Sequence, residues 1–329
     1  MVNDALKSGR RAHIIAYGGL ALTMITTLLV LPGTIPPLSA MFLADLIGTL
    51  LIFGLSVRHN NSSLYDPYWS IAPIYIASWW WAGDLRWQMI LILLAVWIWG
   101  CRLTFNFFRG WSGLDHEDWR YAGFREKVGI WYWPLSLTGF HLMPTVLVFL
   151  GIMPVWYAFT TTQTLTLGAN LGIGLGVLIS VGATALEALA DEQLKDFRDN
   201  RQDPSVIMDV GVWSWCRHPN YLGEVLFWWG LWLACVSANS AALWTAIGPL
   251  SITVLFVVVS IPLIENRMLR SRPHYQHVID TMHSMIPLGR QPPIPDPESL
   301  TLEALTPTAP TMEAALLESP FDASLFEPD

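Results

Sequence analysis

Long stretches without charged side chains recur along this sequence, and each restricts how its segment can fold. An α-helix needs about 20 predominantly apolar residues to cross the hydrocarbon core of a bilayer. The segments that approach this pattern lie at about 14–31, 39–57, 68–83, 87–101, 132–157, 168–190, 219–237 and 241–264. The third and fourth are short. The sequence therefore predicts an all-α integral membrane bundle of about eight transmembrane helices, within a range of about seven to nine.

The composition supports this fold class, because 53% of the residues are apolar, only 13% are charged, and 18 are Trp. Ordinary soluble domains lie outside this range. If the segments alternate across a membrane, every Lys and Arg except Arg86 falls on one side, which the positive-inside rule assigns to the cytoplasm. Both termini are thus expected in the cytoplasm, with a bacterial inner membrane or the endoplasmic reticulum as the host membrane and no nucleic-acid partner.

Two features of the chain carry structural rather than chemical expectations. Residues 291–329 are rich in Pro and acidic residues and contain no basic residue, which predicts a disordered tail. In the sixth apolar segment Gly168, Gly172, Gly174 and Gly176 predict close helix packing through small residues. The Cys residues lack the spacing of metal ligands, so no metal site is predicted.

A polar cluster follows the sixth apolar segment. Glu187, Asp191 and Lys195 fall at intervals of one helical turn, and Arg198 stands nearly one turn further on. These residues share one face of a helix that leaves the membrane at about residue 190. This pattern is typical of a solvated helix end with ion pairs. It also fits a ligand-binding wall if a second polar segment folds against it.

That second segment precedes the seventh apolar segment. Pro219 suits the first turn of a helix, and Arg217 and His218 stand just before it. A helix N-terminus with an adjacent Arg attracts anions such as phosphate. Asn220 and Glu224 lie one turn apart and can reach the same ligand. After the eighth segment, Glu265 is placed to hold either a ligand or Arg217.

The run from Gly211 to Glu224, with Asp191 and Arg198 before it, resembles the C-terminal domain of the steroid 5α-reductase family. It is closer still to an uncharacterised membrane branch with an Arg-His-Pro-Asn-Tyr-x-Gly-Glu run. The resemblance covers about residues 185–290. Asp191, Arg198 and Asn220 stand at the spacings of the family's NADPH contacts. The resemblance thus implies NADPH as the cofactor. Together with the polar segments and the loop after the fourth apolar segment, it gives these candidate pocket residues: Arg102, Asn106, Glu187, Asp191, Arg198, Arg217, His218, Asn220, Tyr221, Glu224 and Glu265.

A second family shares part of this signature. Isoprenylcysteine carboxyl methyltransferases and phospholipid methyltransferases are similar at Arg217-His218-Pro219 and at Tyr221 and Gly223, and their ligand is S-adenosylmethionine. The Asn-Tyr-x-Gly-Glu form of the run favours NADPH, as does the helix with Asp191 and Arg198. A methyltransferase stays open as an alternative.

If NADPH is the cofactor, an acidic group is needed beside the substrate carbonyl. Tyr65, Asp66 and Tyr68 are the catalytic candidates, with Asp66 kept protonated by burial. The alternative is an aromatic belt at the membrane interface, and Asp45 is another buried acid. The following polar loop, 102–127, contains an Asp-Trp-Arg-Tyr run. This loop can close over a cofactor as a lid or lie on lipid headgroups.

The predicted function is a membrane-embedded NADPH-dependent reductase that transfers hydride to a lipophilic, α,β-unsaturated carbonyl compound. The alternatives are an S-adenosylmethionine-dependent methyltransferase and a lipid- or sterol-binding protein without turnover. The predicted domains are residues 1–131 for the substrate side, 132–290 for the reductase-like membrane domain with the cofactor pocket, and 291–329 for the tail.

Overall fold

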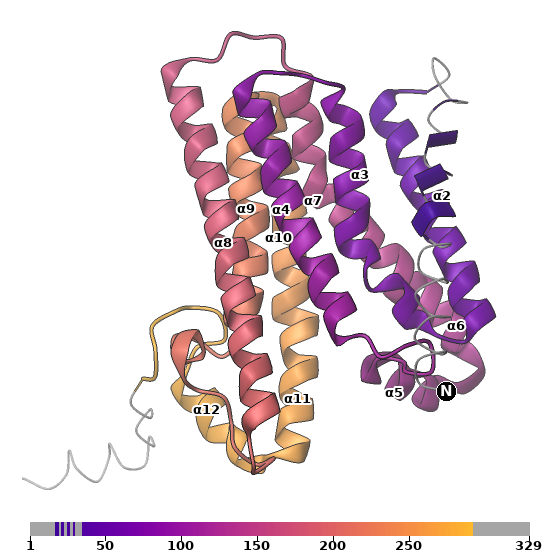
Figure 1. The fold of residues 1–329 in the computed structure, drawn as a ribbon, viewed down its shortest axis with the longest axis vertical. Helices are drawn as coiled ribbons and strands as arrows, with labels where there is room; N and C mark the ends of the chain where they lie inside the picture. Colours follow the sequence, from indigo (N-terminus) through magenta and orange to yellow (C-terminus); the bar gives the residue numbers. More distant parts are fainter. Residues whose placement is uncertain (1–16, 20, 23–24, 27–28, 30–34, 292–329) are drawn as a thin grey trace, which may run out of the picture. The chain divides into compact units, whose positions relative to one another are not determined.

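A computed structural model describes residues 17–19, 21, 22, 25, 26, 29 and 35–291 of the protein. These residues form a bundle of helices (Figure 1), and the described part contains no β-strand beyond an isolated bridge between Met282 and Arg290. Six helical segments are long and apolar enough to cross a membrane, which confirms the all-α membrane fold: Pro37–His59, Trp87–Gly110, Trp119–Phe159, Leu167–Asn200, Pro219–Ala238 and Ser240–Ser271.

The N-terminal part of the bundle begins with α2 (Pro37–His59), which starts at a proline as helices often do. A short 3₁₀ turn, η1 (Ser62–Tyr65), leads to α3 (Tyr68–Trp81). Helix α3 has 14 residues, too few to cross a bilayer alone, and α4 (Trp87–Gly110) follows. Most of the predicted first segment and nearly all of the predicted tail lie outside the described residues.

Helix α4 corrects one expectation. It continues to Gly110, so Arg102 and Asn106 belong to a membrane helix and not to a loop. The Asp-Trp-Arg-Tyr run then starts a separate helix, α5 (Trp119–Val128), whose first turn is capped by the Asp118 carboxylate accepting from the Arg120 N–H. From α5 the chain stays helical through η2 (Gly129–Trp131), α6 (Tyr132–Leu135), η3 (Ser136–Leu142) and α7 (Met143–Phe159).

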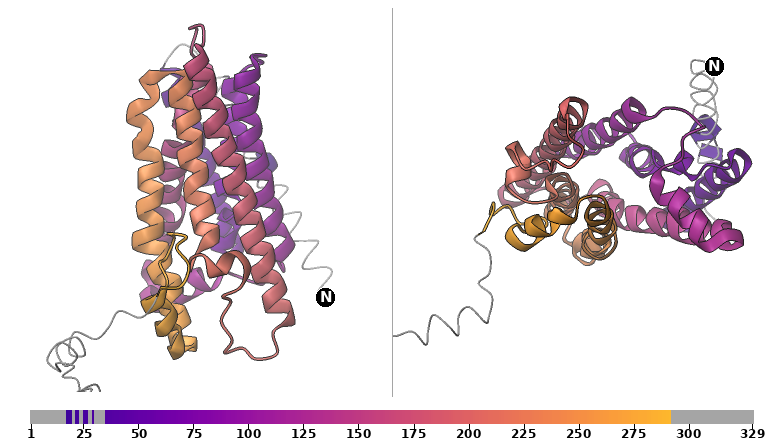
Figure 2. Two further views of the ribbon diagram at one scale, coloured as in Figure 1. Left: turned by 90° about the vertical axis from the view of Figure 1, so that its left-hand side faces the viewer. Right: turned by 90° about the horizontal axis from the view of Figure 1, so that it is seen from below.

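The two longest helices of the C-terminal part, α8 (Leu167–Asn200) and α9 (Pro219–Ala238), pack against each other. Helix η4 (Gly211–Ser214) precedes α9. The remaining elements are η5 (Ser240–Ala246), α10 (Ile247–Leu255), η6 (Phe256–Ser260), α11 (Ile261–Ser271), η7 (Pro273–Tyr275) and α12 (Gln276–Thr281). Seen along the helices, α8 to α12 lie on one side of the bundle and α2 and α3 on the other (Figure 2).

Two of these elements, η3 and η6, are π-helical, and each is followed by a proline. Proline has no N–H and cannot bond to the carbonyl four residues earlier. The carbonyls that lose this partner belong to Phe140 before Pro144 and to Val258 before Pro262. The prolines thus account for the widened helical turns at these two positions.

Small residues bring α8 and α9 into close contact, as the sequence predicted. A Cβ added at Gly176 would lie 2.6 Å from the Gly230 carbonyl oxygen, and one added at Gly172 would lie 2.8 Å from Ser237 Cβ. By contrast, nothing lies within 4 Å of a Cβ at Gly174. Only part of the glycine series therefore serves helix packing, because successive glycines of a helix face different directions.

The connections that carry most of the basic residues gather at one end of the helices. Helix α5, the connection between α8 and α9, and α11 lie at the lower end in Figure 1, whereas the connection with Arg86 lies at the opposite end. This arrangement agrees with the alternation expected from the charges. We refer to the end with α5 and α11 as the basic end.

Candidate functional site

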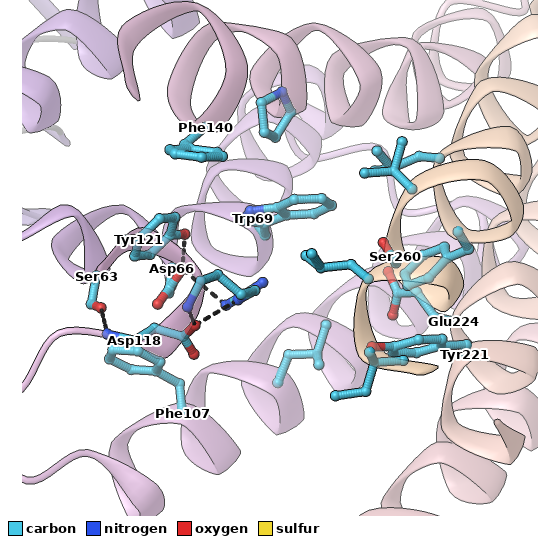
Figure 3. Close-up of a pocket in the computed structure, with 18 of the residues that line it drawn as sticks. Ser63, Asp66, Trp69, Phe107, Asp118, Tyr121, Phe140, Tyr221, Glu224 and Ser260 are labelled. Carbon is cyan, nitrogen blue, oxygen red and sulfur yellow. Dashed lines mark hydrogen bonds and ion pairs between the residues drawn. The ribbon is translucent and has the colours of Figure 1, made fainter. Parts of the chain in front are cut away.

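A cavity of about 900 Å³ opens inside the basic end of the bundle. Seven parts of the chain form its wall: η1 with the start of α3, the end of α4 with the loop that follows it, α5, η3 with the start of α7, the C-terminal half of α8, the start of α9, and the segment from α10 to α11. A volume of this size suits a cofactor, a drug-sized ligand, or both in part. Its polar side chains form two groups on opposite sides, with Asp66 and Tyr121 on one side and Tyr221 and Glu224 on the other (Figure 3).

The first polar group belongs to α8 and α9, and we call it the α8–α9 wall: Glu187, Asp191, Asn220 and Glu224. Helical spacing places both members of each helix on one face. The close approach at Gly223 then brings the two faces together, since a Cβ there would lie 2.8 Å from Glu187 Cβ. These four residues are among those that the sequence pattern assigned to a cofactor.

Helix α4 adds the positive charge of this wall. Arg102 forms ion pairs with Glu187, at 2.8 Å, and with Asp191. Asn106 Nδ2 donates to Asp191 Oδ2 at 2.9 Å, and Asn220 Nδ2 lies 3.4 Å from Asp191 Oδ1. Arg102 and Asn106, which the sequence pattern placed in a loop, therefore contact Glu187 and Asp191 from helix α4.

Hydrogen bonding in the wall is complete at one carboxylate and incomplete at another. Glu224 accepts hydrogen bonds from the indole N–H groups of Trp99, at 2.9 Å, and Trp228, at 2.8 Å. Glu187 Oε2 is buried, and no described residue donates to it. A buried oxygen without a donor is costly, so this position favours a ligand that brings a hydroxyl or amide N–H.

The second polar group surrounds Asp66, which lies between η1 and α3. The Tyr121 hydroxyl donates to Asp66 Oδ1 at 2.5 Å, and Arg120 lies 3.7 Å from the same oxygen. Burial raises the pKa of the Asp66 carboxyl to about 6, although Arg120 and the hydrogen bond from Tyr121 oppose the rise. The pair offers a carboxyl group that titrates near neutral pH beside a phenol, which is a combination suited to proton transfer.

The other two catalytic candidates do not line the cavity. Tyr65 and Tyr68 are each 1% exposed. The Tyr65 hydroxyl lies 2.8 Å from Thr145 Oγ1, and the Tyr68 hydroxyl donates to Asp45 Oδ1 at 2.6 Å. A role for Tyr65 and Tyr68 at a substrate stays a prediction. In this structure the hydrogen bond of Tyr65 joins η1 to α7, and that of Tyr68 joins α3 to α2.

Arg217, His218 and Glu265 form a separate cluster that the described cavity does not reach. Arg217 Nε donates to Glu265 Oε1 at 2.6 Å, and His218 Nε2 lies 2.8 Å from the same oxygen. The backbone N–H groups of Arg217 and His218 donate to carbonyls of the segment 283–284. The backbone N–H groups just before α9 and the Arg217 side chain are thus paired with the chain's own C-terminal segment and with Glu265. Tyr221 lines the cavity, whereas His218 does not, and the two rings stack with centroids 5.3 Å apart.

Arg198 also lies outside the cavity lining, near the end of α8. It interacts electrostatically with Asp191 and with three further cations, Arg201, Arg267 and Arg272. Among the described residues, no carboxylate forms an ion pair with Arg198, Arg201 or Arg267 at 4.0 Å or less. This cationic cluster can therefore receive an anion.

Tyr121 is the residue that sequence reasoning missed. The sequence pointed to its Asp-Trp-Arg-Tyr run but left lid and headgroup contact undecided. The structure places Asp118, Trp119, Arg120 and Tyr121 in the cavity wall. Aromatic side chains also line the cavity: Trp69, Phe107, Trp111, Phe124 and Phe140. The only signal in the sequence was the density of polar and aromatic residues in this run.

Comparison with known proteins gives a family but no activity. A family model described as a protein of unknown function (DUF1295) matches residues 52–281. An uncharacterized protein of the fission yeast Schizosaccharomyces pombe is 26% identical over 251 residues, which cover 68% of this chain and 72% of the yeast protein. No solved structure matches the chain.

Proposed function

The chain belongs to the DUF1295 family of proteins of unknown function, and from its cavity we propose that it is a membrane-embedded NADPH-dependent reductase of lipophilic α,β-unsaturated carbonyl compounds. The observation that carries the proposal is the pairing, across one aromatic-lined cavity, of a proton-donating group with an acceptor-rich wall. We further propose that the basic end faces the cytoplasm.

Two features of the basic end, the α8–α9 wall and the cationic cluster around Arg198, fit the cofactor. The carboxylates and amide of the wall, with the unsatisfied Glu187 Oε2, suit the hydroxyl and amide N–H groups of a ribose and a nicotinamide. The cationic cluster around Arg198 suits the phosphates. Arg102, Asn106, Asp191 and Asn220 would hold the cofactor between these two positions. Bound NADPH would supply a hydride to the β carbon of the substrate.

Tyr121 and Asp66 would provide the complementary proton. When Asp66 is protonated, its carboxyl can donate to the Tyr121 oxygen, which frees the Tyr121 hydroxyl to donate to the substrate carbonyl. Negative charge develops on this carbonyl oxygen as hydride adds at the β carbon, so the donor stabilises the transition state. Trp69 and Phe140 would enclose the substrate and exclude water.

A specific observation supports a second candidate, the S-adenosylmethionine-dependent methyltransferase. The α8–α9 wall contains three carboxylates, Glu187, Asp191 and Glu224, but Arg102 is the only cation paired with them among the described residues. An acidic wall also suits a sulfonium cation. A direct comparison of ligands is therefore required.

The test is the thermal stabilisation of the purified protein in lipid nanodiscs by NADPH, NADH and S-adenosylmethionine. A ligand present at 100 times its Kd adds about 2.7 kcal/mol to the stability of the state that binds it. We expect selective stabilisation by NADPH, and weaker stabilisation in Asp191→Ala and Asn220→Ala. Asp196→Ala, an exposed position further along α8, is the matched control.

Each other outcome contradicts the proposal in a defined way. Selective stabilisation by S-adenosylmethionine would identify a methyltransferase. A response to neither ligand would favour a lipid- or sterol-binding protein without turnover. NADPH binding without oxidation of NADPH across a panel of lipophilic enones would refute the reductase step while keeping the cofactor site.

A further inference from the structure

The exposed residues that line the cavity fall into two groups of opposite chemical character. Each group marks a place where the cavity can open to the surface. Three of these residues, Met143, Val258 and Val259, are apolar and lie on the side of the bundle where η3 and η6 face the cavity. Three others, His116, Arg120 and Asn266, are polar and lie at the basic end.

The apolar opening results from helices that meet at one end only. In the half away from the basic end, α7 and α10 touch closely, since a Cβ at Gly151 would lie 2.8 Å from the Ile252 side chain. Towards the basic end they separate, and α6 and α11 stand well apart in Figure 1. The π-helical turn η3 lies between α6 and α7, and η6 lies between α10 and α11. Figure 3 shows Phe140 of η3 and Ser260 of η6 on different sides of the cavity.

The exposure of this opening is that of a surface in contact with lipid. Val258 is 64% exposed and Val259 is 49% exposed, and both belong to a segment that crosses the membrane by length and composition. No charged side chain lies among the three residues of this opening. Water finds no hydrogen-bond partner at such a surface, whereas a hydrocarbon chain meets an apolar environment both in the bilayer and in the opening.

We propose that the cavity has a lateral opening to the bilayer between η3 and η6, and that hydrocarbon-bearing molecules reach it through this opening from the lipid phase. The polar opening at the basic end is a separate route for water-soluble ligands. The assignment of the lipid-phase molecule as the substrate rests on the proposed function, but the route itself does not. A molecule that enters between η3 and η6 moves along Phe140 and Trp69 towards Tyr121.

The experiment uses the whole protein in phosphatidylcholine nanodiscs that contain a small proportion of an alkyl diazirine, a photoreactive hydrocarbon probe. After illumination, mass spectrometry locates the labelled residues. We expect labelling of the cavity residues Trp69, Phe107 and Phe140, in addition to lipid-facing residues such as Leu178, which is 69% exposed. Labelling at Leu178 without any label in the cavity would overturn the proposal.

Substitutions at the opening make the test specific. Val259→Trp and Met143→Trp place a bulky ring in the opening from opposite sides, and both should abolish labelling of Trp69 and Phe107. Val257→Trp is the matched control, because Val257 is 47% exposed in the same π-helical turn but does not line the cavity. Equal interior labelling in all three variants would refute a route between η3 and η6.

A parallel measurement separates this inference from the reductase proposal. The thermal response of Val259→Trp to NADPH should equal that of the unsubstituted protein, because the cofactor uses the polar opening. If the cavity is labelled but NADPH has no effect, the lateral opening stands and the cofactor assignment fails. If NADPH stabilises the protein but the cavity stays unlabelled, the cofactor assignment stands and the lateral opening fails.

Discussion

The raised pKa of Asp66 follows from the burial of its carboxyl group, which outweighs the nearby charge of Arg120. Arg120 lies 3.7 Å away and Tyr121 donates to the carboxylate, but burial outweighs both contacts and raises the pKa from 3.8 to about 6. The folded state therefore holds a proton that the unfolded state has released between these two pH values. This difference links the residue both to stability and to chemistry.

The first prediction concerns the pH dependence of stability. Because the folded state binds more protons between about pH 4 and pH 6, the contribution of Asp66 to stability should fall as pH rises through this window, by at most about 3 kcal/mol, and stay constant above it. Asp66→Asn should lose this dependence and melt at a higher temperature than the unsubstituted protein at pH 7. If the melting temperatures of the two proteins change with pH in the same way across this window, the assignment is contradicted.

The control for this measurement is Asp115→Asn. Asp115 is exposed in the loop before α5, so its substitution should leave the pH dependence unchanged. Both variants remove one carboxylate from the same end of the bundle, so a difference between them isolates the effect of burial.

The second prediction tests the Tyr121 hydroxyl. Tyr121→Phe keeps the ring, which packs on Phe140 with centroids 5.1 Å apart, and removes only the donor. We expect kcat for reduction of an enone to fall by roughly 10²- to 10³-fold, the usual effect of deleting one donor to a developing oxyanion, with little change in NADPH affinity. Tyr132→Phe is the matched control, since the Tyr132 hydroxyl bonds to Ser62 and does not face the cavity. A similar fall in both variants would point to a structural effect.

At the scale of the helix, the cofactor wall depends on how closely α8 approaches α9. Glu187 and Asp191 belong to one helix, and Asn220 and Glu224 belong to the other. The glycine contacts further along the same pair set the separation. Packing at a distance from the site therefore controls the geometry of the site.

The third prediction changes this separation. Gly176→Val should destabilise the protein by about 1–3 kcal/mol, because the added carbons meet the backbone of α9 at Gly230 and Ala234, and should also weaken NADPH binding. Gly174→Val adds the same side chain two residues away, where nothing lies within 4 Å, and should have little effect. The thermal shift with and without NADPH measures both quantities. Equal effects at the two positions would show that helix propensity, not packing, is responsible.

At the scale of the whole molecule, the two ends of the helices differ in charge. Arg86 is at one end, whereas α5, α11 and the loops between α8 and α9 carry their Lys and Arg at the other. This asymmetry predicts the orientation in the membrane.

The fourth prediction tests this orientation in a Cys101→Ala background. Gln163→Cys, in the connection between α7 and α8, should react with a membrane-impermeant maleimide in intact cells. Asp115→Cys, at the basic end, should react only after the membrane is permeabilised. The opposite pattern would place the polar opening of the cavity outside the cytoplasm and would exclude cytoplasmic NADPH as the ligand.

The local pattern of the sequence determined the helices, and much of the α8–α9 wall. Apolar length alone located the six spanning segments of the described residues, since a bilayer leaves few alternatives to a helix. It also predicted a span at 68–83, where α3 has only 14 residues. Residues one turn apart, such as Asn220 and Glu224, share a face whatever the helix packs against. For this reason Glu187, Asp191, Asn220 and Glu224 could be selected before their surroundings were known.

Only the tertiary structure decided which polar groups meet across the chain. Tyr121 reaches Asp66 from 55 residues away, and Arg217 donates to the carbonyl of Met282 from 65 residues away. No periodicity encodes such pairs, because they depend on how α5 and the C-terminal segment fold back onto the bundle. The same packing separates η3 from η6 and opens the cavity, since the space between two helices is a property of both helices and of the side chains that hold them apart.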